Sequence, residues 1–145
     1  MSGLESLYQE LILDHAKNRR GFGLAGSEAD ATSHQRNPIC GDEITVRVRM
    51  DGDCVASLTW EGAGCSISQA SASMLAELAA EGLDRAASQR LIEGFREAMR
   101  SKGTLELDED VFGDATALSG VSKYTARVKC AMLSWVAFED ALRRA

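Results

Sequence analysis

The sequence predicts an α+β fold in which a small antiparallel sheet of about three strands is covered on one face by helices. Residues 43–60 contain two stretches of alternating apolar and polar residues, joined by the turn signal Asp51-Gly52. Long segments on either side carry apolar residues at helical spacing, and a half-apolar antiparallel sheet needs such helices to cover it. The chain has 145 residues and shows no linker or internal repeat, so residues 1–145 are expected to form one domain.

The first helix is expected over residues 2–18. Ser2 and Glu5 form a capping-box pattern at its start, and Gly21 follows its basic end. A polar segment near residues 30–36 is a candidate edge strand. The residues that recur on one face of the helix are Leu4, Leu7, Tyr8, Leu11, Ile12 and His15.

Two strands are expected over residues 43–50 and 54–60. Apolar side chains alternate with Thr45, Arg47 and Arg49 in the first strand. In the second strand, strict alternation places Cys54 in the core, with no reactive role. The residues expected to share its face are Ala56, Leu58 and Trp60.

Three further helices are expected over residues 66–78, 84–100 and 126–144, because each carries apolar residues at helical spacing. The acidic, glycine-punctuated stretch over residues 101–121 is expected to be a loop or a short helical segment. The methionines at helical spacing are most simply core residues, and they are Met74, Met99 and Met132.

The composition excludes several classes of function. The chain has 16 basic and 22 acidic residues and a net charge of −6, which is a poor basis for binding nucleic acid. No apolar run approaches the roughly 18 residues of a membrane-spanning helix, and no signal-peptide pattern is present. We therefore expect a cytoplasmic protein that binds neither nucleic acid nor membrane. In a reducing compartment its 4 cysteines are expected to be thiols or metal ligands.

Three cysteines lie where an expected strand or helix begins or ends, namely Cys40, Cys65 and Cys130. Asp42 follows Cys40 by two residues, so in an extended chain both side chains project to the same face. Three thiolates and one carboxylate suit tetrahedral zinc. The alternative is that the cysteines are small buried hydrophobic residues, and the wide separations along the chain leave both readings open.

The two histidines give little support for a hydrolase in which a cysteine is the nucleophile. His15 lies on the apolar face of the first helix and is expected to be a partly buried, hydrogen-bonded residue. His34 is expected on a solvated loop or sheet edge. A dithiol oxidoreductase has little support either, because no Cys-x-x-Cys motif is present.

Several motifs occur in an order that resembles the iron–sulfur assembly proteins of the IscU type, most closely their SufU branch. Two features favour that branch: Lys129 stands where IscU proteins have a histidine before the third cysteine, and the stretch from Cys65 to Cys130 looks long. The motifs are Asp14-His15-x2-Asn18, Asn37-Pro38-x-Cys40-Gly41-Asp42, Glu61-Gly62-x-Gly64-Cys65-Ser66-Ile67-Ser68 and Gly120-Val121-Ser122-Lys123-x2-Ala126-Arg127-x-Lys129-Cys130.

The resemblance implies that Zn²⁺ is held by Cys40, Asp42, Cys65 and Cys130, with Arg127 close by to stabilise the anionic site. It also implies that the protein accepts sulfur from a pyridoxal-phosphate cysteine desulfurase of the SufS type and supplies downstream iron–sulfur assembly proteins. Cys40 is the expected nucleophile, because its loop, between Pro38 and Gly41, is expected to move most readily. The partner would then have to supply a metal ligand in place of Cys40.

Two other functions remain open from the sequence. The same three cysteines and aspartate could hold an iron–sulfur cluster, since soft thiolates suit iron and sulfide as well as zinc. The protein would then be a scaffold on which a cluster is assembled and passed on. A third hypothesis is a non-catalytic adaptor that docks a partner and uses zinc only to stabilise its own fold.

Overall fold

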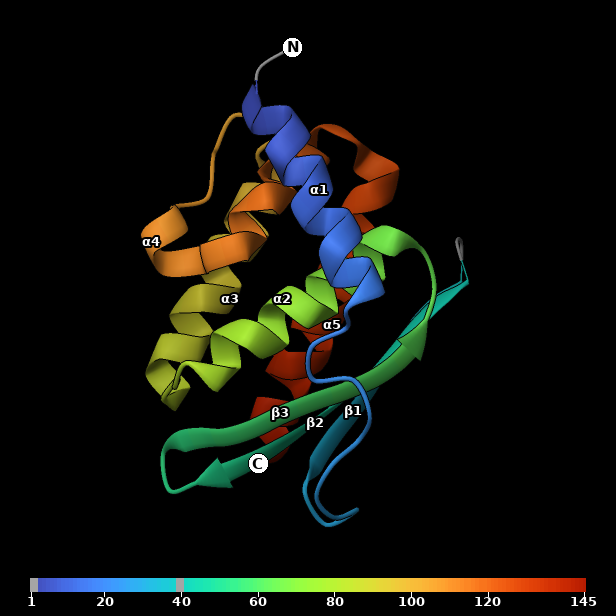
Figure 1. Cartoon of the computed structure of the whole chain (residues 1–145). Coiled ribbons are helices and arrows are strands. Elements are labelled where there is room, and N and C mark those ends of the chain that lie inside the picture. Colours follow the sequence, from blue (N-terminus) through green and yellow to red (C-terminus); the bar gives the residue numbers. More distant parts are fainter. Residues whose placement is uncertain (1–2, 39–40) are drawn as a thin grey trace.

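The computed structural model describes residues 3–38 and 41–145 of the chain. Three antiparallel strands form one sheet in the order β1-β2-β3, and the helices gather on one side of it (Figure 1). This arrangement confirms the predicted α+β class. In chain order the elements are α1 (Gly3–Lys17), β1 (Ala31–Asn37), β2 (Asp42–Asp51), β3 (Cys54–Ala63), α2 (Ser66–Ala80), α3 (Arg85–Arg100), α4 (Glu109–Phe112), the 3₁₀ helix η1 (Gly113–Lys123) and α5 (Thr125–Arg144).

The polar edge strand predicted near residues 30–36 is present as β1, and its register pairs Asn37 with Asp42 across the β1–β2 connection. His34 is exposed on this strand, as expected, and its Nε2 lies 2.9 Å from Glu43 Oε1. The predicted cap at Ser2 lies outside the described residues.

The prediction that Cys54 lies in the core is wrong. Arg49 pairs with Ser57 and Met50 pairs with Val55, so Ala56 is an extra residue in β3 and forms a β-bulge. Because a bulge shifts the alternation by one residue, Val55 turns into the core while Cys54 and Ala56 are exposed.

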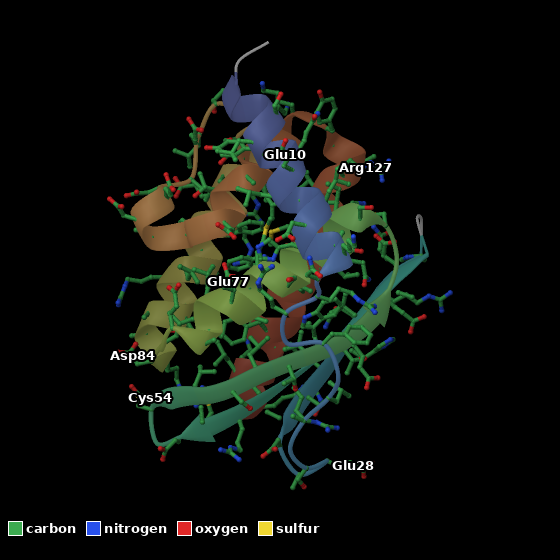
Figure 2. The ribbon with its side chains drawn as sticks, in the orientation of Figure 1. Glu10, Glu28, Cys54, Glu77, Asp84 and Arg127 are labelled. Carbon is green, nitrogen blue, oxygen red and sulfur yellow. The ribbon has the colours of Figure 1, made fainter. Side chains whose placement is uncertain are left out.

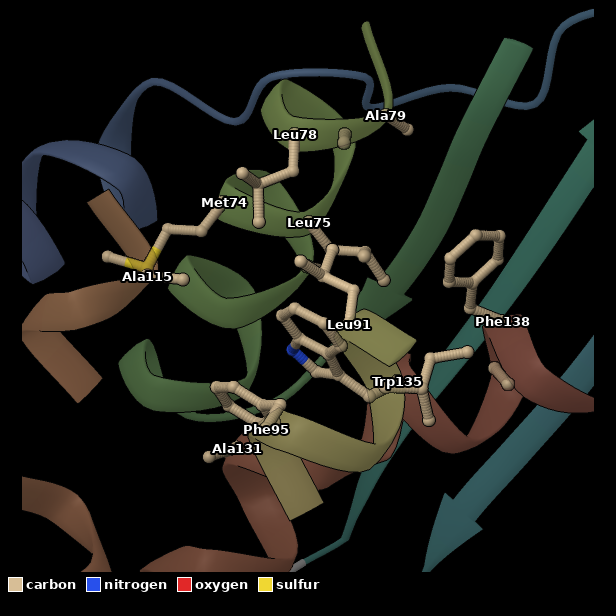
Figure 3. Packing of buried hydrophobic residues seen from close by; sticks show 14 of the residues in the cluster. Met74, Leu75, Leu78, Ala79, Leu91, Phe95, Ala115, Ala131, Trp135 and Phe138 are labelled. Carbon is tan, nitrogen blue, oxygen red and sulfur yellow. The ribbon is translucent and has the colours of Figure 1, made fainter. Parts of the chain in front are cut away.

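The core lies between the sheet and helices α2 and α5. Helix α5 packs against β1 and β2, and α2 packs against β3. At the centre, the Trp135 ring stacks on Phe95 with centroids 4.1 Å apart, and Trp135 Nε1 donates to Ser71 Oγ at 3.0 Å (Figure 3). Met74 and Met99 are buried as predicted, and Met132 packs half-buried against the same cluster. This core fixes the ends of α2 and α5 relative to the sheet.

The stretch over residues 101–121, predicted as a loop or short helical segment, contains α4 and most of η1. Much of η1 is buried, and it packs against α1, α2 and α5. Its Ser119 and Ser122 hydroxyls accept hydrogen bonds from the backbone N–H groups of Leu107 and Gly103, at 2.9 and 2.7 Å. No helix among residues 3–38 and 41–145 is long and apolar enough to cross a membrane.

Candidate metal centre

Three side chains that are far apart in the sequence meet at one end of the sheet. Asp42 opens β2, Cys65 is the N-cap residue of α2, and Cys130 lies near the start of α5. One carboxylate oxygen and the two Sγ atoms all lie within 4.8 Å of one another. Asp42 and Cys130 are each only 1% exposed, whereas Cys65 is partly accessible to solvent.

The carboxylate of Asp42 holds the loop that carries Cys65. The backbone N–H of Cys65 donates to Asp42 Oδ1 at 3.0 Å, and its Sγ lies 3.4 Å from Oδ2. Ser68, in the first turn of α2, donates its hydroxyl to the carbonyl of Cys65 at 3.0 Å. Because these contacts join β2 to the start of α2, the core packing of both elements determines the positions of the donor atoms.

Gly64 is required where it stands, directly before Cys65. Its φ is +154°, a backbone angle that residues other than glycine rarely adopt. A Cβ at this position would lie 2.6 Å from Asp42 Cγ and 2.8 Å from Ser68 Oγ. The absence of a side chain therefore lets the Asp42 carboxylate approach the backbone that precedes Cys65.

The described donors fit a zinc ion. Tetrahedral zinc with Zn–S bonds of about 2.3 Å places its ligand atoms about 3.8 Å apart, and donors gathered within 4.8 Å need only small movements to reach that spacing. A buried carboxylate beside two ionisable thiols is costly unless a cation balances it. Zinc bound by such thiols keeps them deprotonated.

The two other predicted site residues are Cys40 and Arg127. Cys40, predicted as a ligand and nucleophile, lies outside the described residues. Arg127 is exposed on the first turn of α5 and lines the same pocket as Cys65 (labelled in Figure 2). The exposed Cys54 lies at the opposite end of the sheet (Figure 2), away from this cluster.

A second titratable cluster, which the sequence did not predict, ties α1 to α2 and η1. His15 is 0% exposed, with Nδ1 2.8 Å from Ser73 Oγ and Nε2 2.9 Å from Asp114 Oδ2. Arg20 Nη1 donates to Nδ1 at 3.0 Å, so Nε2 carries the hydrogen that His15 donates to Asp114. His15 was expected to be a partly buried, hydrogen-bonded residue, and it is fully buried with these partners, but no sequence pattern pointed to Ser73 or Asp114 as the partners.

The donor atoms of His15, Glu77 and Asp114 also lie within 4.8 Å of one another, but a cation already stands among them. Arg20 Nε lies 2.9 Å from Glu77 Oε2, and its Nη2 lies 3.3 Å from Asp14 Oδ2. This guanidinium thus already contacts two of the three members of the cluster, Glu77 and His15. Burial, and then the nearby charge of Asp114, raise the pKa of Glu77. We therefore interpret this cluster as a structural charge network.

The fold and the first cluster together define a class of protein: a small α+β domain that gathers thiols and a carboxylate from the ends of separate elements to hold a soft metal. The chain belongs to the family of NifU-like N-terminal domains, whose model matches residues 7–131. This result confirms the family resemblance inferred from the motifs.

Named relatives cover nearly the whole chain. The chain is 40% identical over 144 residues to the zinc-dependent sulfurtransferase SufU of Bacillus subtilis, with 99% of this chain and 94% of SufU covered. It is 34% identical to the iron–sulfur cluster assembly scaffold protein IscU of Streptococcus pyogenes, with 99% and 87% covered. The crystal structure of the N-terminal part of a nitrogen-fixing NifU-like protein from Brucella abortus superposes with a TM-score of 0.83 at 25% identity, with 99% and 96% covered.

Proposed function

We propose that this protein is a zinc-dependent sulfur acceptor that takes persulfide sulfur from a pyridoxal-phosphate cysteine desulfurase for iron–sulfur cluster assembly. The observation that carries the proposal is the cluster of Asp42, Cys65 and Cys130, whose donor atoms lie within 4.8 Å of one another. The same chain is 40% identical, over 99% of its length, to a protein named as a zinc-dependent sulfurtransferase. Thiolates held by zinc stay deprotonated at neutral pH, which is the state that sulfur transfer requires.

In this proposal Asp42, Cys65 and Cys130 hold the ion, and Cys40 is both the fourth ligand and the nucleophile. Cys40 precedes Asp42 by two residues in the sequence, so its thiol is tethered to the cluster. Once released from the donor set, the Cys40 thiolate attacks the terminal sulfur of the persulfide on the partner. A new S–S bond forms on Cys40 as the old one breaks, and the partner's cysteine leaves as a thiolate. Arg127, at the same end of α5 as Cys130, offsets the negative charge of these ligands.

The test compares two cysteine variants. Cys40→Ala should abolish the stimulation of sulfide release by the desulfurase, while circular dichroism stays that of the folded wild-type protein. Cys54→Ala is the matched control, because Cys54 is exposed far from the cluster and should leave the stimulation intact. Wild-type stimulation by Cys40→Ala would contradict the proposed sulfur relay.

A scaffold role is the second candidate, favoured by the 34% identity to a protein named as an iron–sulfur cluster assembly scaffold. The thiols of Cys40, Cys65 and Cys130 and the carboxylate of Asp42 can hold iron and sulfide as well as zinc. Protein purified without oxygen and without added metal separates the two functions. One zinc per chain by elemental analysis supports sulfur acceptance, whereas a visible charge-transfer spectrum that survives purification supports the scaffold.

A further inference from the structure

A pocket of about 530 Å³ opens beside the metal centre, between α1, η1 and the start of α5. Cys65 lines it, so one of the metal ligands forms part of its wall. Ile12 of α1 and Val121 of η1 contribute apolar surface, and Tyr124, which joins η1 to α5, is 64% exposed. A volume of this size can accommodate several side chains of another molecule.

Two cations line the pocket in a protein that is acidic overall. Among the side chains that the structure describes, Lys123 and Arg127 line it and no Asp or Glu does, although the whole chain carries a net charge of −6. Within the described part of the chain neither cation forms a salt bridge, whereas Arg20, Arg96 and Arg144 all do. Arg127 is assigned above to the charge of the metal ligands, so an occupant that brings a carboxylate would chiefly meet the ammonium group of Lys123.

The aliphatic stem of Lys123 lies against Gly103. A Cβ at Gly103 would lie 2.9 Å from Lys123 Cε and 3.2 Å from Cδ, so the aliphatic stem of the lysine lies across the glycine.

We propose that this pocket receives a segment of the sulfur-donating enzyme that carries an acidic and an apolar side chain, and thereby brings the donor's cysteine to the metal centre. This inference rests on the proposed function. The donor's sulfur is attached to a protein side chain, so a stretch of that protein must come within bonding distance of the cluster that Cys65 belongs to. The pocket that Cys65 lines also has apolar surface and the ammonium group of Lys123.

Gly120 allows the pocket to be filled without disturbing the fold. It lines the pocket, its φ lies outside the left-handed region, and a Cβ built on it meets nothing within 4 Å. Gly120→Leu should therefore fold and occupy the space meant for the partner's segment. The matched control is Ala86→Leu, which adds the same side chain at an exposed position of α3, an element that does not line the pocket.

The experiment measures the Kd between the zinc-loaded protein and the cysteine desulfurase of the SufS type from the same organism, together with the KM for this protein in stimulated sulfide release. Gly120→Leu should raise both constants by about tenfold or more, the order expected when a central interface contact is lost. Lys123→Glu should raise them by about tenfold at low salt, and the effect should shrink as ionic strength rises. Ala86→Leu should match wild type.

Zinc content and circular dichroism separate this proposal from its rivals. If Lys123 only balanced the charge of the metal centre, Lys123→Glu would lose zinc and leave the Kd of the zinc-loaded protein unchanged, which would overturn the docking role. Wild-type Kd and KM for Gly120→Leu would overturn it as well, while leaving the proposed function intact. If the wild-type protein itself neither binds nor stimulates the desulfurase, that result contradicts the proposed function, and the docking proposal with it.

Discussion

Gly64 shows how one residue governs the chemistry next to it. Glycine is needed here both for its φ of +154° and for the space that a Cβ would take from the Asp42 carboxylate. Cys65 is the N-cap residue of α2, and a buried carboxylate that accepts from its backbone N–H needs room on the preceding residue. Asp42, Gly64 and Cys65 therefore act as one local unit.

Gly64→Ala should lower the affinity for zinc by about tenfold or more, since displaced partners of metal ligands typically cost that much. Gly52→Ala is the control, because Gly52 has a φ of +61° but nothing within 4 Å of a Cβ, so it introduces backbone strain without a collision. Competition with a chelator measures both affinities. Equal zinc affinities for the two variants would show that the collision with Asp42 does not matter.

At the scale of elements, the network around His15 joins three segments that do not share a sheet. His15 comes from α1, Ser73 and Glu77 come from α2, and Asp114 comes from η1, with Arg20 placed among them from the loop after α1. Because His15 is fully buried, the loss of the Asp114 carboxylate would leave the buried Nε2 without a hydrogen bond. The network thus fixes how α1 lies against α2 and η1.

Glu77 makes the stability of this network depend on pH. Burial and the charge of Asp114 raise its pKa above the ordinary 4.5, while His15 and Arg20 act in the opposite direction. The folded protein therefore holds this proton more tightly than the unfolded chain does. Its contribution to stability is fully present below pH 4.5 and is lost as the pH rises through the raised pKa of the folded state.

Glu77→Gln removes this titration. The free energy of unfolding of the variant, relative to wild type, should increase as the pH rises from below 4.5 to neutral. Urea unfolding of both proteins over that range measures the difference. A difference that stays constant with pH, or that falls, would show that Glu77 does not titrate above its ordinary value in the folded protein.

For the molecule as a whole, the metal centre lies at the edge of a core that does not depend on it. Buried residues from β2 and β3 and from α2, α3, η1 and α5 form a continuous cluster of apolar side chains. The two described cysteines of the centre sit at the starts of helices whose inner faces pack elsewhere in that core. Zinc is therefore expected to add stability to a fold that already exists.

Removal of the metal with a chelator should lower the melting temperature without abolishing cooperative unfolding or helical circular dichroism. Zinc restored at about a hundredfold excess over its Kd should recover about 2.7 kcal/mol by mass action. Thermal scans of the apo and zinc-loaded protein measure this difference. Unfolding on chelation, as in small zinc fingers, would instead support the adaptor in which zinc only stabilises the fold.

Local patterns in the sequence predicted most of the elements correctly. The helices and strands follow from apolar periodicity, and even β1 was anticipated from a polar stretch that pairs along only one side. Cys54 is the informative failure, because strict alternation assigned it to the core. The bulge at Ala56 depends on how β3 pairs with β2, and no pattern within β3 itself reveals it.

The sequence by itself determined the fold class and named Cys40, Asp42, Cys65 and Cys130 as candidate ligands, of which the structure describes the last three. It could do so because periodicity and motifs are carried by neighbouring residues. Only the tertiary structure decided that these three side chains converge, that Gly64 makes room for Asp42, and that His15 joins α1 to α2 and η1. It alone also placed Lys123 and Gly120 around a pocket beside Cys65. The physical reason is that contacts between residues many positions apart form only when the core has fixed the helices against the sheet.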